Sequence, residues 1–309
     1  AFANNAGVSG SVDGRGGIDR FDFSAYTSTG LRVNIGDQLT AGAAGVVAAR
    51  SASNVAAGAS ERVRNFEHVT GGGGNDVIVG NSTNDYAGAN SGRNILIGAG
   101  GNDTIYGSGG SDILIGDSAS VGIANDGTLL SIASTNLQSG GNDAIDGGDG
   151  VDYILGGFGG DTISGGTGND LIFGDAGQIN FVSGLPSLAE SSSGDIGGND
   201  QINGDDGDDL LVGGMGSDTI NGGVGHDFII GDGGSATFNT TTHVIIRLAT
   251  TTAAAGAGDV IDAGNGNNLV LGGAGEGRLV GRIHVGGGRG EFGRRGIDAL
   301  IDRADTERL

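Results

Sequence analysis

The side chains best suited to chemistry in this sequence are aspartates that recur every nine residues. Units such as "GGTGNDLIF" (165–173) place one carboxylate after a glycine-rich turn and before a short apolar run. Carboxylates close to backbone carbonyls are the oxygen ligands that Ca²⁺ prefers, whereas Mg²⁺ is stricter about geometry and sheds water reluctantly. We therefore expect these turns to hold calcium, with solvated metal-free turns as the alternative.

The preference for aspartate over asparagine indicates that the sixth position of each unit must carry charge. In the 15 units whose sixth position runs from Asp76 to Asn268, that position holds 13 aspartates and two asparagines. Both amino acids form turns readily, so turn formation does not explain the bias. Like charges about 5 Å apart repel by roughly 0.8 kcal/mol even in water. A divalent cation between them would reverse the sign of that interaction.

Each unit predicts a turn followed by a three-residue strand. Glycine permits the positive φ angles of tight turns, and the eighth position is Ile, Leu or Val in 14 of the 15 units, with Ala87 as the exception. Two units make one coil, and coils stacked about 4.8 Å apart form two parallel sheets. We expect one thin apolar column between the sheets to be the whole core. Acids 18 residues apart should stack, as Asp152 with Asp170. Asp85 and Asp103 form another expected pair.

A longer period of 57 to 59 residues is superimposed on the nonapeptide. Each run of consecutive nonapeptide units, here called a block, ends in Gly-Asp. About twenty residues without the pattern follow, and the next block begins at the turn of Asp143, Asp200 or Asp259. The departing segments are rich in Thr, Val and Ile, which favours strands. We expect strand-bearing inserts at about 116–138, 174–195 and 231–254. The closing residues Asp117, Asp175 and Asp232 are equally suited to be ligands or turn formers.

Composition excludes several classes of partner and site. The chain has 70 glycines, no cysteine, and 15 basic against 37 acidic residues, for a net charge of -22. Disulfides and thiolate metal sites are therefore excluded. Nucleic acid and anionic membranes would be repelled by such charge, and no apolar run reaches the roughly 20 residues of a membrane-spanning helix.

The flanking regions differ from the repeats. Residues 1–70 are expected to form an N-terminal cap with one degenerate unit around Asp19, and the Ala-rich stretch 41–60 is expected to be a loop or a short helix. Repeats should fill 71–276. The Arg-rich segment 277–309 is expected to be a cap, an export signal or an assembly tail, ending in a short amphipathic helix near 297–304.

The nonapeptide resembles that of the repeats-in-toxin (RTX) family of secreted bacterial proteins. The resemblance implies a calcium-stabilised parallel β-roll, export by a type I system and folding in extracellular calcium. The calcium ligands it implies are the matching aspartates Asp76, Asp85, Asp103, Asp112, Asp143, Asp152, Asp161, Asp170, Asp200, Asp209, Asp218, Asp227 and Asp259. Weaker candidates are Asn94, Asn268, Asp19, Asp117, Asp175 and Asp232.

The sequence favours a binding or structural role over catalysis. It has no H-E-x-x-H zinc motif and no G-x-S-x-G nucleophile motif, and its four histidines are scattered. We expect an extracellular or cell-surface structural or adhesive segment that binds several calcium ions. One alternative is a subunit of a fibre or surface layer that stacks end to end. Another is the secretion and folding module of a hydrolase or toxin whose catalytic domain lies elsewhere.

Overall fold

The computed structural model describes residues 93–192, 197–242, 244–250 and 257–272, the backbone of ten further strands, and the side chains of Val69 and Ile78. Within these residues all regular structure is strand, as an all-β fold requires. No helix in this part of the chain is long and apolar enough to cross a membrane. The expected helix near 297–304 lies outside the described residues. In the Ala-rich stretch the described backbone forms strands β4 (Thr40–Gly42), β5 (Gly45–Val47) and β6 (Ser51–Ala52), and the rest of this stretch lies outside the described residues.

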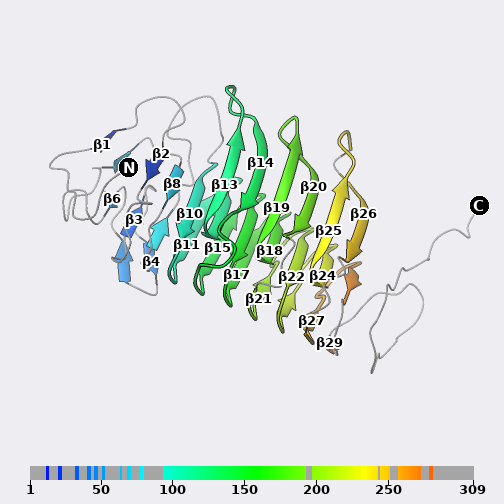
Figure 1. The fold of residues 1–309 in the computed structure, drawn as a ribbon. Coiled ribbons are helices and arrows are strands. Elements are labelled where there is room, and N and C mark those ends of the chain that lie inside the picture. Colours follow the sequence, from blue (N-terminus) through cyan, green and yellow to red (C-terminus); the bar gives the residue numbers. More distant parts are fainter. Residues whose placement is uncertain are drawn as a thin grey trace, which may run out of the picture.

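Successive units alternate between two parallel sheets that stack coil upon coil (Figure 1). We call the nine-stranded one the covered sheet. Its strands, in order, are β2 (Arg20–Asp22), β8 (His68–Thr70), β10 (Ile95–Ala99), β12 (Ile113–Asp117), β16 (Tyr153–Gly157), β18 (Leu171–Asp175), β22 (Leu210–Gly214), β24 (Phe228–Asp232) and β28 (Leu269–Leu271).

The ten-stranded sheet, here the polar sheet, faces the covered sheet across the coil. In order it contains β29 (Arg278–Val280), β27 (Val260–Asp262), β23 (Thr219–Asn221), β21 (Gln201–Asn203), β17 (Thr162–Thr167), β15 (Ala144–Asp149), β11 (Thr104–Gly109), β9 (Val77–Val79), β3 (Arg32–Asn34) and β6. Only the β3–β6 pair is antiparallel among these strands. Two small pairs, β1 (Val12–Asp13) with β7 (Val63–Arg64) and β4 with β5, complete the N-terminal part.

The eighth-position side chains fill the space between the two parallel sheets, as expected from the repeat. Ile145 lies opposite Ile163 in the polar sheet, and Ile154 lies opposite Ile172 in the covered sheet. These residues belong to one buried cluster that runs from Val69 to Val270. Each contributes roughly 1.5 to 3 kcal/mol of burial energy, so this column aligns the coils.

The three inserts form hairpins that join into a third sheet along the roll (Figure 1). This hairpin sheet is antiparallel and contains β13 (Ala119–Ile123), β14 (Leu129–Ser134), β19 (Gly177–Val182), β20 (Leu185–Ser191), β25 (Gly234–Phe238) and β26 (Ile245–Thr250). Neighbouring hairpins pair through β14–β19 and β20–β25. Each block adds two strands to the covered sheet and two to the hairpin sheet, and strands are about 4.8 Å apart in both. The equal rise lets the hairpins meet.

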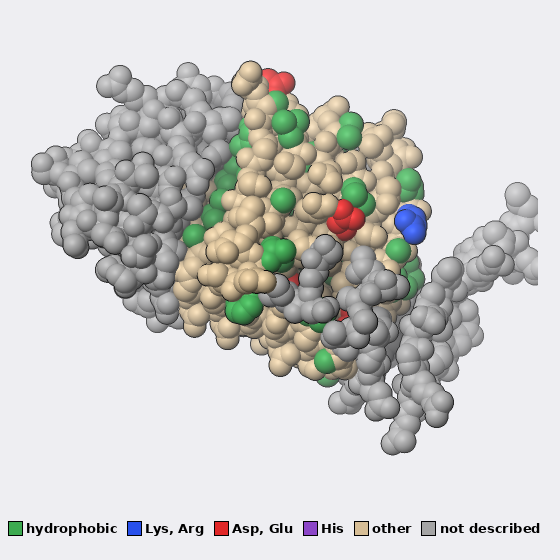
Figure 2. Space-filling view, viewed as in Figure 1, with side chains coloured by type: hydrophobic (Ala, Val, Ile, Leu, Met, Phe, Trp, Pro, Cys, Tyr) green, Lys and Arg blue, Asp and Glu red, His purple; other side chains and the backbone are tan. Residues whose placement is uncertain are grey.

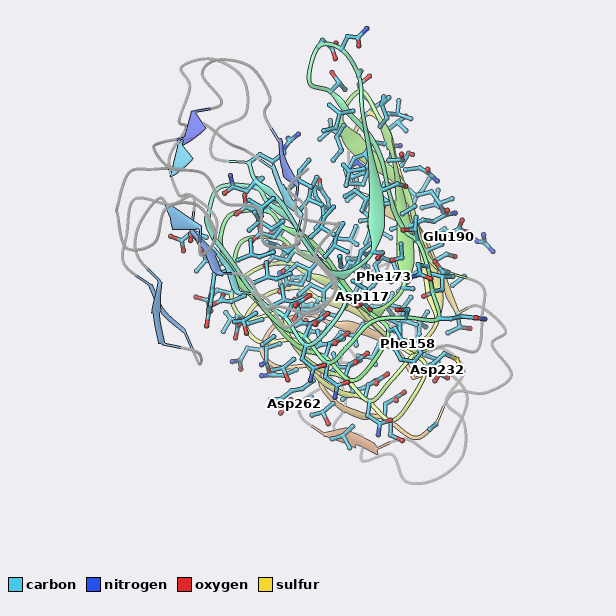
Figure 3. The ribbon with its side chains drawn as sticks, turned by 60° about the vertical axis from the view of Figure 1, so that its left-hand side comes forward. Asp117, Phe158, Phe173, Glu190, Asp232 and Asp262 are labelled. Carbon is cyan, nitrogen blue, oxygen red and sulfur yellow. The ribbon has the colours of Figure 1, made fainter. Side chains whose placement is uncertain are left out.

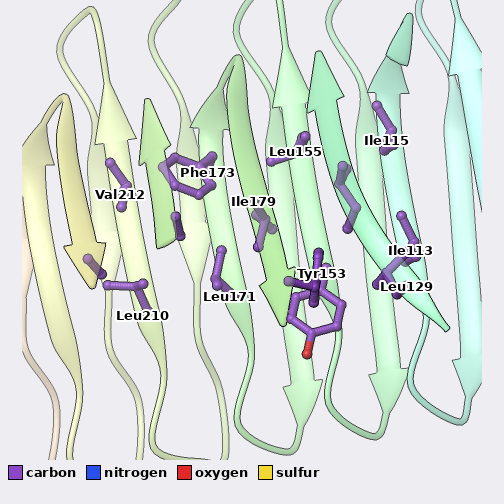
Figure 4. Close-up of a cluster of buried hydrophobic side chains, with 14 of the residues drawn as sticks. Ile113, Ile115, Leu129, Tyr153, Leu155, Leu171, Phe173, Ile179, Leu210 and Val212 are labelled. Carbon is purple, nitrogen blue, oxygen red and sulfur yellow. The ribbon is translucent and has the colours of Figure 1, made fainter. Parts of the chain in front are cut away.

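The expectation of a single thin core was wrong, because the hairpin sheet covers a second one (Figure 4). In the covered sheet, positions seven and nine of each unit are apolar: Leu171 and Phe173 point away from the roll core yet are only 4% and 2% exposed. Their burial comes from hairpin residues such as Ile179 in the same cluster. Tyr153 of the roll and Phe181 of a hairpin meet edge to face at 5.2 Å between ring centroids. The polar sheet instead has residues such as the exposed Thr162 in these positions.

The expected stacking of Asp85 below Asp103 was also wrong. Strand β11, which follows Asp103, pairs with β9 so that Thr104 lies opposite Val77. The coil next to Asp103 therefore belongs to the unit of Asp76, because β9 is the strand of that unit.

Candidate metal sites

The carboxylate at position six bonds to the backbone of the preceding coil. The Asp152 N–H donates to Asp170 Oδ1 at 2.8 Å, and the Asp112 N–H donates to Asp152 Oδ1 at 2.7 Å. The same bond crosses the inserts, where the partners are 39 to 41 residues apart, as in Asp161 N–H to Asp200 Oδ1 at 2.7 Å. The structure thus brings the sequence-predicted aspartates into two ladders, one at each turn of the coil.

The second carboxylate oxygen has no such partner. Oδ2 is buried and accepts no hydrogen bond in Asp112, Asp143, Asp152, Asp161, Asp170, Asp200, Asp209, Asp218, Asp227 and Asp259. Leaving a charged acceptor buried without a partner costs more than the roughly 1 to 3 kcal/mol of a neutral group. Because the same free-energy cost recurs at every one of these Oδ2 atoms, we expect a bound group from solution, not a protein atom, to be their partner.

The glycine at position one shows what surrounds this oxygen. A Cβ atom at Gly156 would lie 2.4 Å from Asp161 Oδ2 and 2.0 Å from the Gly174 carbonyl oxygen of the next coil. At each position-one glycine from Gly98 to Gly231, an aspartate Oδ2 and a backbone carbonyl oxygen both lie within 2.0 to 2.8 Å of where a Cβ atom would be. Two acceptors, one of them charged, are therefore held together, and a hard cation is the natural partner for both.

Asn268 is a natural control for this arrangement. Its Oδ1 accepts the Asp227 N–H at 2.8 Å, as an aspartate in the ladder would. Its Nδ2, which takes the place of Oδ2, donates to the carbonyl oxygen of Ala263, the first residue of its own unit. The Asn268 amide therefore donates to this carbonyl oxygen without a cation. An aspartate in its place has no side-chain N–H group and could not do so. This geometry favours a capping role for Asn268 over ligation.

Burial raises the pKa of each of these ten aspartates. The pKa of Asp161 rises to about 10, chiefly through burial and further through the charges of Asp143 and Asp200. The pKa of Asp112 rises to about 9, whereas that of Asp170 rises only to about 6. Ionised carboxylates are thus unfavourable in the folded chain unless an added positive charge compensates them.

Acid is expected to stabilise the calcium-free roll. The ordinary aspartate pKa is 3.8, and the folded-state values lie between about 6 and 10. Folding therefore takes up protons; this stabilisation is complete below pH 3.8 and is lost as the pH rises through 6 to 10. After calcium has been removed by dialysis against EGTA at pH 8 and the protein has been transferred to calcium-free buffers, the β signal in circular dichroism should be stronger at about pH 5 than at about pH 8. A signal that grows with pH would contradict this prediction.

No group of three or more His, Asp or Glu side chains within the described residues could hold a metal ion. The candidate sites are therefore not carboxylate clusters. They combine one or two carboxylates with backbone carbonyls of glycine turns, a donor set that suits calcium, which accepts 6 to 8 oxygens in flexible geometry.

A further ladder at position five was missed by the sequence reasoning. Asn142 Oδ1 accepts the Gly160 N–H at 3.1 Å, and Asn199 Oδ1 accepts the Ser217 N–H at 2.8 Å. His226 takes the same part, since its Nδ1 accepts the Asn267 N–H at 2.9 Å. The frequent asparagine at position five was the available signal. This ladder accepts from the following coil, whereas the aspartates accept from the preceding one.

The remaining sequence-predicted residues have different outcomes. Asp76, Asp85 and Asp19 lie outside the described residues. Asn94 is buried at the first described coil, and its N–H donates to Asp112 Oδ1 at 2.7 Å. Asp103 joins the ladder through its N–H to Asp143 Oδ1 at 2.7 Å.

The comparison with protein families agrees with this geometry. A model described as the RTX calcium-binding nonapeptide repeat matches residues 66–87, 88–120, 139–163, 155–178, 197–229, 210–237 and 254–279, more than half of the chain. The chain belongs to this family. The RTX repeats bind several calcium ions and are a structural rather than a catalytic repeat. RTX proteins are typically secreted by bacteria. No curated protein matches the chain.

Proposed function

We propose that the buried position-six aspartates are the calcium ligands of this RTX roll, each through Oδ2 together with turn carbonyls. The ligands within the described residues are Asp103, Asp112, Asp143, Asp152, Asp161, Asp170, Asp200, Asp209, Asp218, Asp227 and Asp259. Asp76 and Asp85 carry the same motif and complete the proposal from sequence alone. The convergence of Oδ2 and a carbonyl at each position-one glycine supports this assignment.

Replacing Asp152 with asparagine should weaken calcium binding without removing the ladder. The amide retains an oxygen to accept the Asp112 N–H, but its other atom is a nitrogen that cannot ligate a cation. We expect a loss on the order of 1.5 to 3 kcal/mol, the range for contacts to charged groups. Calcium titration by calorimetry measures it. Asp126→Asn, in an exposed hairpin turn, is the matched control, and equal effects of the two variants would refute the ligand role.

We further propose that the chain is an extracellular, calcium-stiffened structural segment whose hairpin sheet is its contact face. The observation that carries this is the low charge of that sheet. The described residues of the three hairpins have only Asp126, Glu190 and Arg247 as acidic or basic residues, in a protein with net charge -22. Figure 2 shows this face, on which uncharged atoms dominate. Acidic surfaces repel one another, so a near-neutral face is where contacts form most readily.

Small-angle X-ray scattering tests the structural role. With calcium, the chain should scatter as a stiff folded body, and in EGTA it should expand as its charges repel one another. A folded but flexible chain in calcium would contradict the role as a stiff segment. It would leave calcium binding itself intact, so the two proposals can fail separately.

A fibre subunit is the second candidate, favoured by the edges of the hairpin sheet. Among the described residues, β13 and β26 each have a neighbouring strand on one side only. Val244, beside β26, and Ile246 within it are 57% and 63% exposed. Unpaired edges with apolar side chains can add strands from another copy. Electron microscopy at high protein concentration with calcium tests this, since monodisperse short particles would exclude the fibre.

A further inference from the structure

The Gly-Asp pairs that precede the hairpins occupy a fixed place in the nonapeptide. Gly116 stands at position one of its turn and Asp117 at position two, after which the hairpin departs. The turn resumes at position three with Gly140 and continues through Gly141 to Asp143. Gly174 and Asp175 stand in the same relation to Gly197 and Gly198. The hairpins therefore interrupt a calcium-binding turn between its second and third residues.

The Asp117 carboxylate joins the two ends of the interrupted turn. Its Oδ1 accepts the N–H of Gly141, which follows the hairpin, at 3.2 Å. Its Oδ2 accepts the N–H of Phe158, which stands at position three of the next coil, at 2.5 Å. Figure 3 labels Asp117 and Phe158, which lie where the first hairpin leaves the roll. One side chain thus contacts the hairpin stem and the neighbouring coil.

Asp175 repeats this arrangement at the second hairpin. Its Oδ1 accepts the Gly198 N–H at 3.0 Å, and its Oδ2 accepts the Met215 N–H. Met215 stands at position three of its unit, as Phe158 does. Because both aspartates accept from residues at the same two repeat positions, the arrangement is a recurring feature of the fold.

The surroundings of both carboxylates are shaped to receive them. A Cβ atom at Gly140 would lie 1.9 Å from Asp117 Oδ2, and one at Gly197 would lie 2.0 Å from Asp175 Oδ2. Asp117 and Asp175 are 4% and 5% exposed. Both oxygens of each carboxylate are occupied by backbone donors, in contrast to the bare Oδ2 of the position-six aspartates. This difference separates the two kinds of aspartate.

We propose that Asp117 and Asp175 are clamps that fasten the hairpin sheet to the roll and are not calcium ligands. Each clamp forms only after the next coil is in place, because one of its two donors belongs to that coil. The calcium-driven stacking of two coils is thereby coupled to the docking of the hairpin between them. Asp232 stands at the same position before the third hairpin, but there the corresponding N–H, that of Ala257, donates to the Gly216 carbonyl oxygen at 3.2 Å, so the proposal is confined to Asp117 and Asp175. The inference rests on calcium-dependent folding of the roll but not on which atoms ligate calcium.

The variant Asp117→Asn tests the clamp, because asparagine keeps one acceptor and sets an NH₂ group against the other backbone donor. We expect the number of bound calcium ions, measured by equilibrium dialysis, to be unchanged. Hydrogen exchange of residues 119–134 should become at least tenfold faster, while exchange of residues 201–232 stays as in the unaltered chain. Asp126→Asn, in the turn of the same hairpin, is the control and should change neither readout.

Two outcomes would overturn the clamp. Loss of one calcium ion in Asp117→Asn would show that the residue is a ligand, and unchanged protection of the hairpin would show that it is only a turn former. Asp175→Asn repeats the test at the second hairpin. If neither variant folds, the calcium positions in crystals of the unaltered chain decide, since an ion bonded to the Asp117 or Asp175 carboxylate contradicts the proposal and its absence from both supports it.

Discussion

Chelation of calcium at neutral pH is expected to abolish most of the β structure of this chain. Within the described part of the chain, the Oδ2 atoms of ten position-six aspartates are buried and accept no hydrogen bond, and burial together with neighbouring aspartates raises the pKa of residues such as Asp161 and Asp218 to about 10 and about 8. Without a cation these groups must either bind protons or leave the interior. A metal that binds only the folded chain contributes its binding free energy to folding, so its removal should unfold the roll cooperatively.

Far-UV circular dichroism during an EGTA titration measures this effect. The β signal should fall in EGTA and return with excess calcium. Magnesium at the same concentration is the control and should restore little, because it demands near-octahedral geometry and keeps its waters. A spectrum that is unchanged after complete chelation would show that the glycine turns are stable without metal.

Phe173→Ala should be among the most destabilising single substitutions. Phe173 is 2% exposed and lies between the covered sheet and the hairpin sheet. Truncating a buried phenylalanine costs about 3 to 5 kcal/mol, because it removes apolar contacts and leaves a cavity. We expect this loss in urea denaturation at saturating calcium, accompanied by faster hydrogen exchange in β19 and β20.

Phe158→Ala is the matched control, since it removes the same atoms from a side chain that is 38% exposed. Its cost should be below about 1 kcal/mol, in line with surface substitutions. Similar losses in the two variants would indicate that the second core contributes nothing specific to stability.

The repeat made the parallel roll predictable, because each nonapeptide encodes its own turn, strand and core residue. Ile172 could be placed in the core from its position alone, and its burial confirms this. The pairing of Asp103 could not be derived from an 18-residue spacing, because only the strand register shows that its coil meets the unit of Asp76.

The second core was harder to predict, although a signal for it exists. Leu171 and Phe173 flank Ile172, whereas Thr162 and Ser164 flank Ile163, and this contrast recurs from coil to coil. The apolar flanks identify the covered sheet only if the inserts are known to fold back over one of the two sheets. The hairpins can do so because strands are spaced equally in the covered sheet and in the hairpin sheet, which is a property of the packed structure rather than of any one segment.

The role of Asp117 could not be separated from ligation by residue type, because turn formers, clamps and calcium ligands all use aspartate. What distinguishes Asp117 is its pair of backbone donors, the N–H groups of Gly141 and Phe158, which lie on either side of the interrupted turn and are brought together only in the folded chain. The bare Oδ2 of Asp152 is the corresponding structural mark of a ligand.

The anomalous difference map of a crystal grown in calcium tests most directly whether these aspartates bind the cation. We expect calcium peaks beside Oδ2 of the buried position-six aspartates, such as Asp152, Asp161 and Asp170, with the turn carbonyls of the adjacent glycines completing each site at about 2.3 to 2.6 Å. Peaks confined to surface carboxylates, with Oδ2 of these aspartates bonded to no cation, would contradict this expectation.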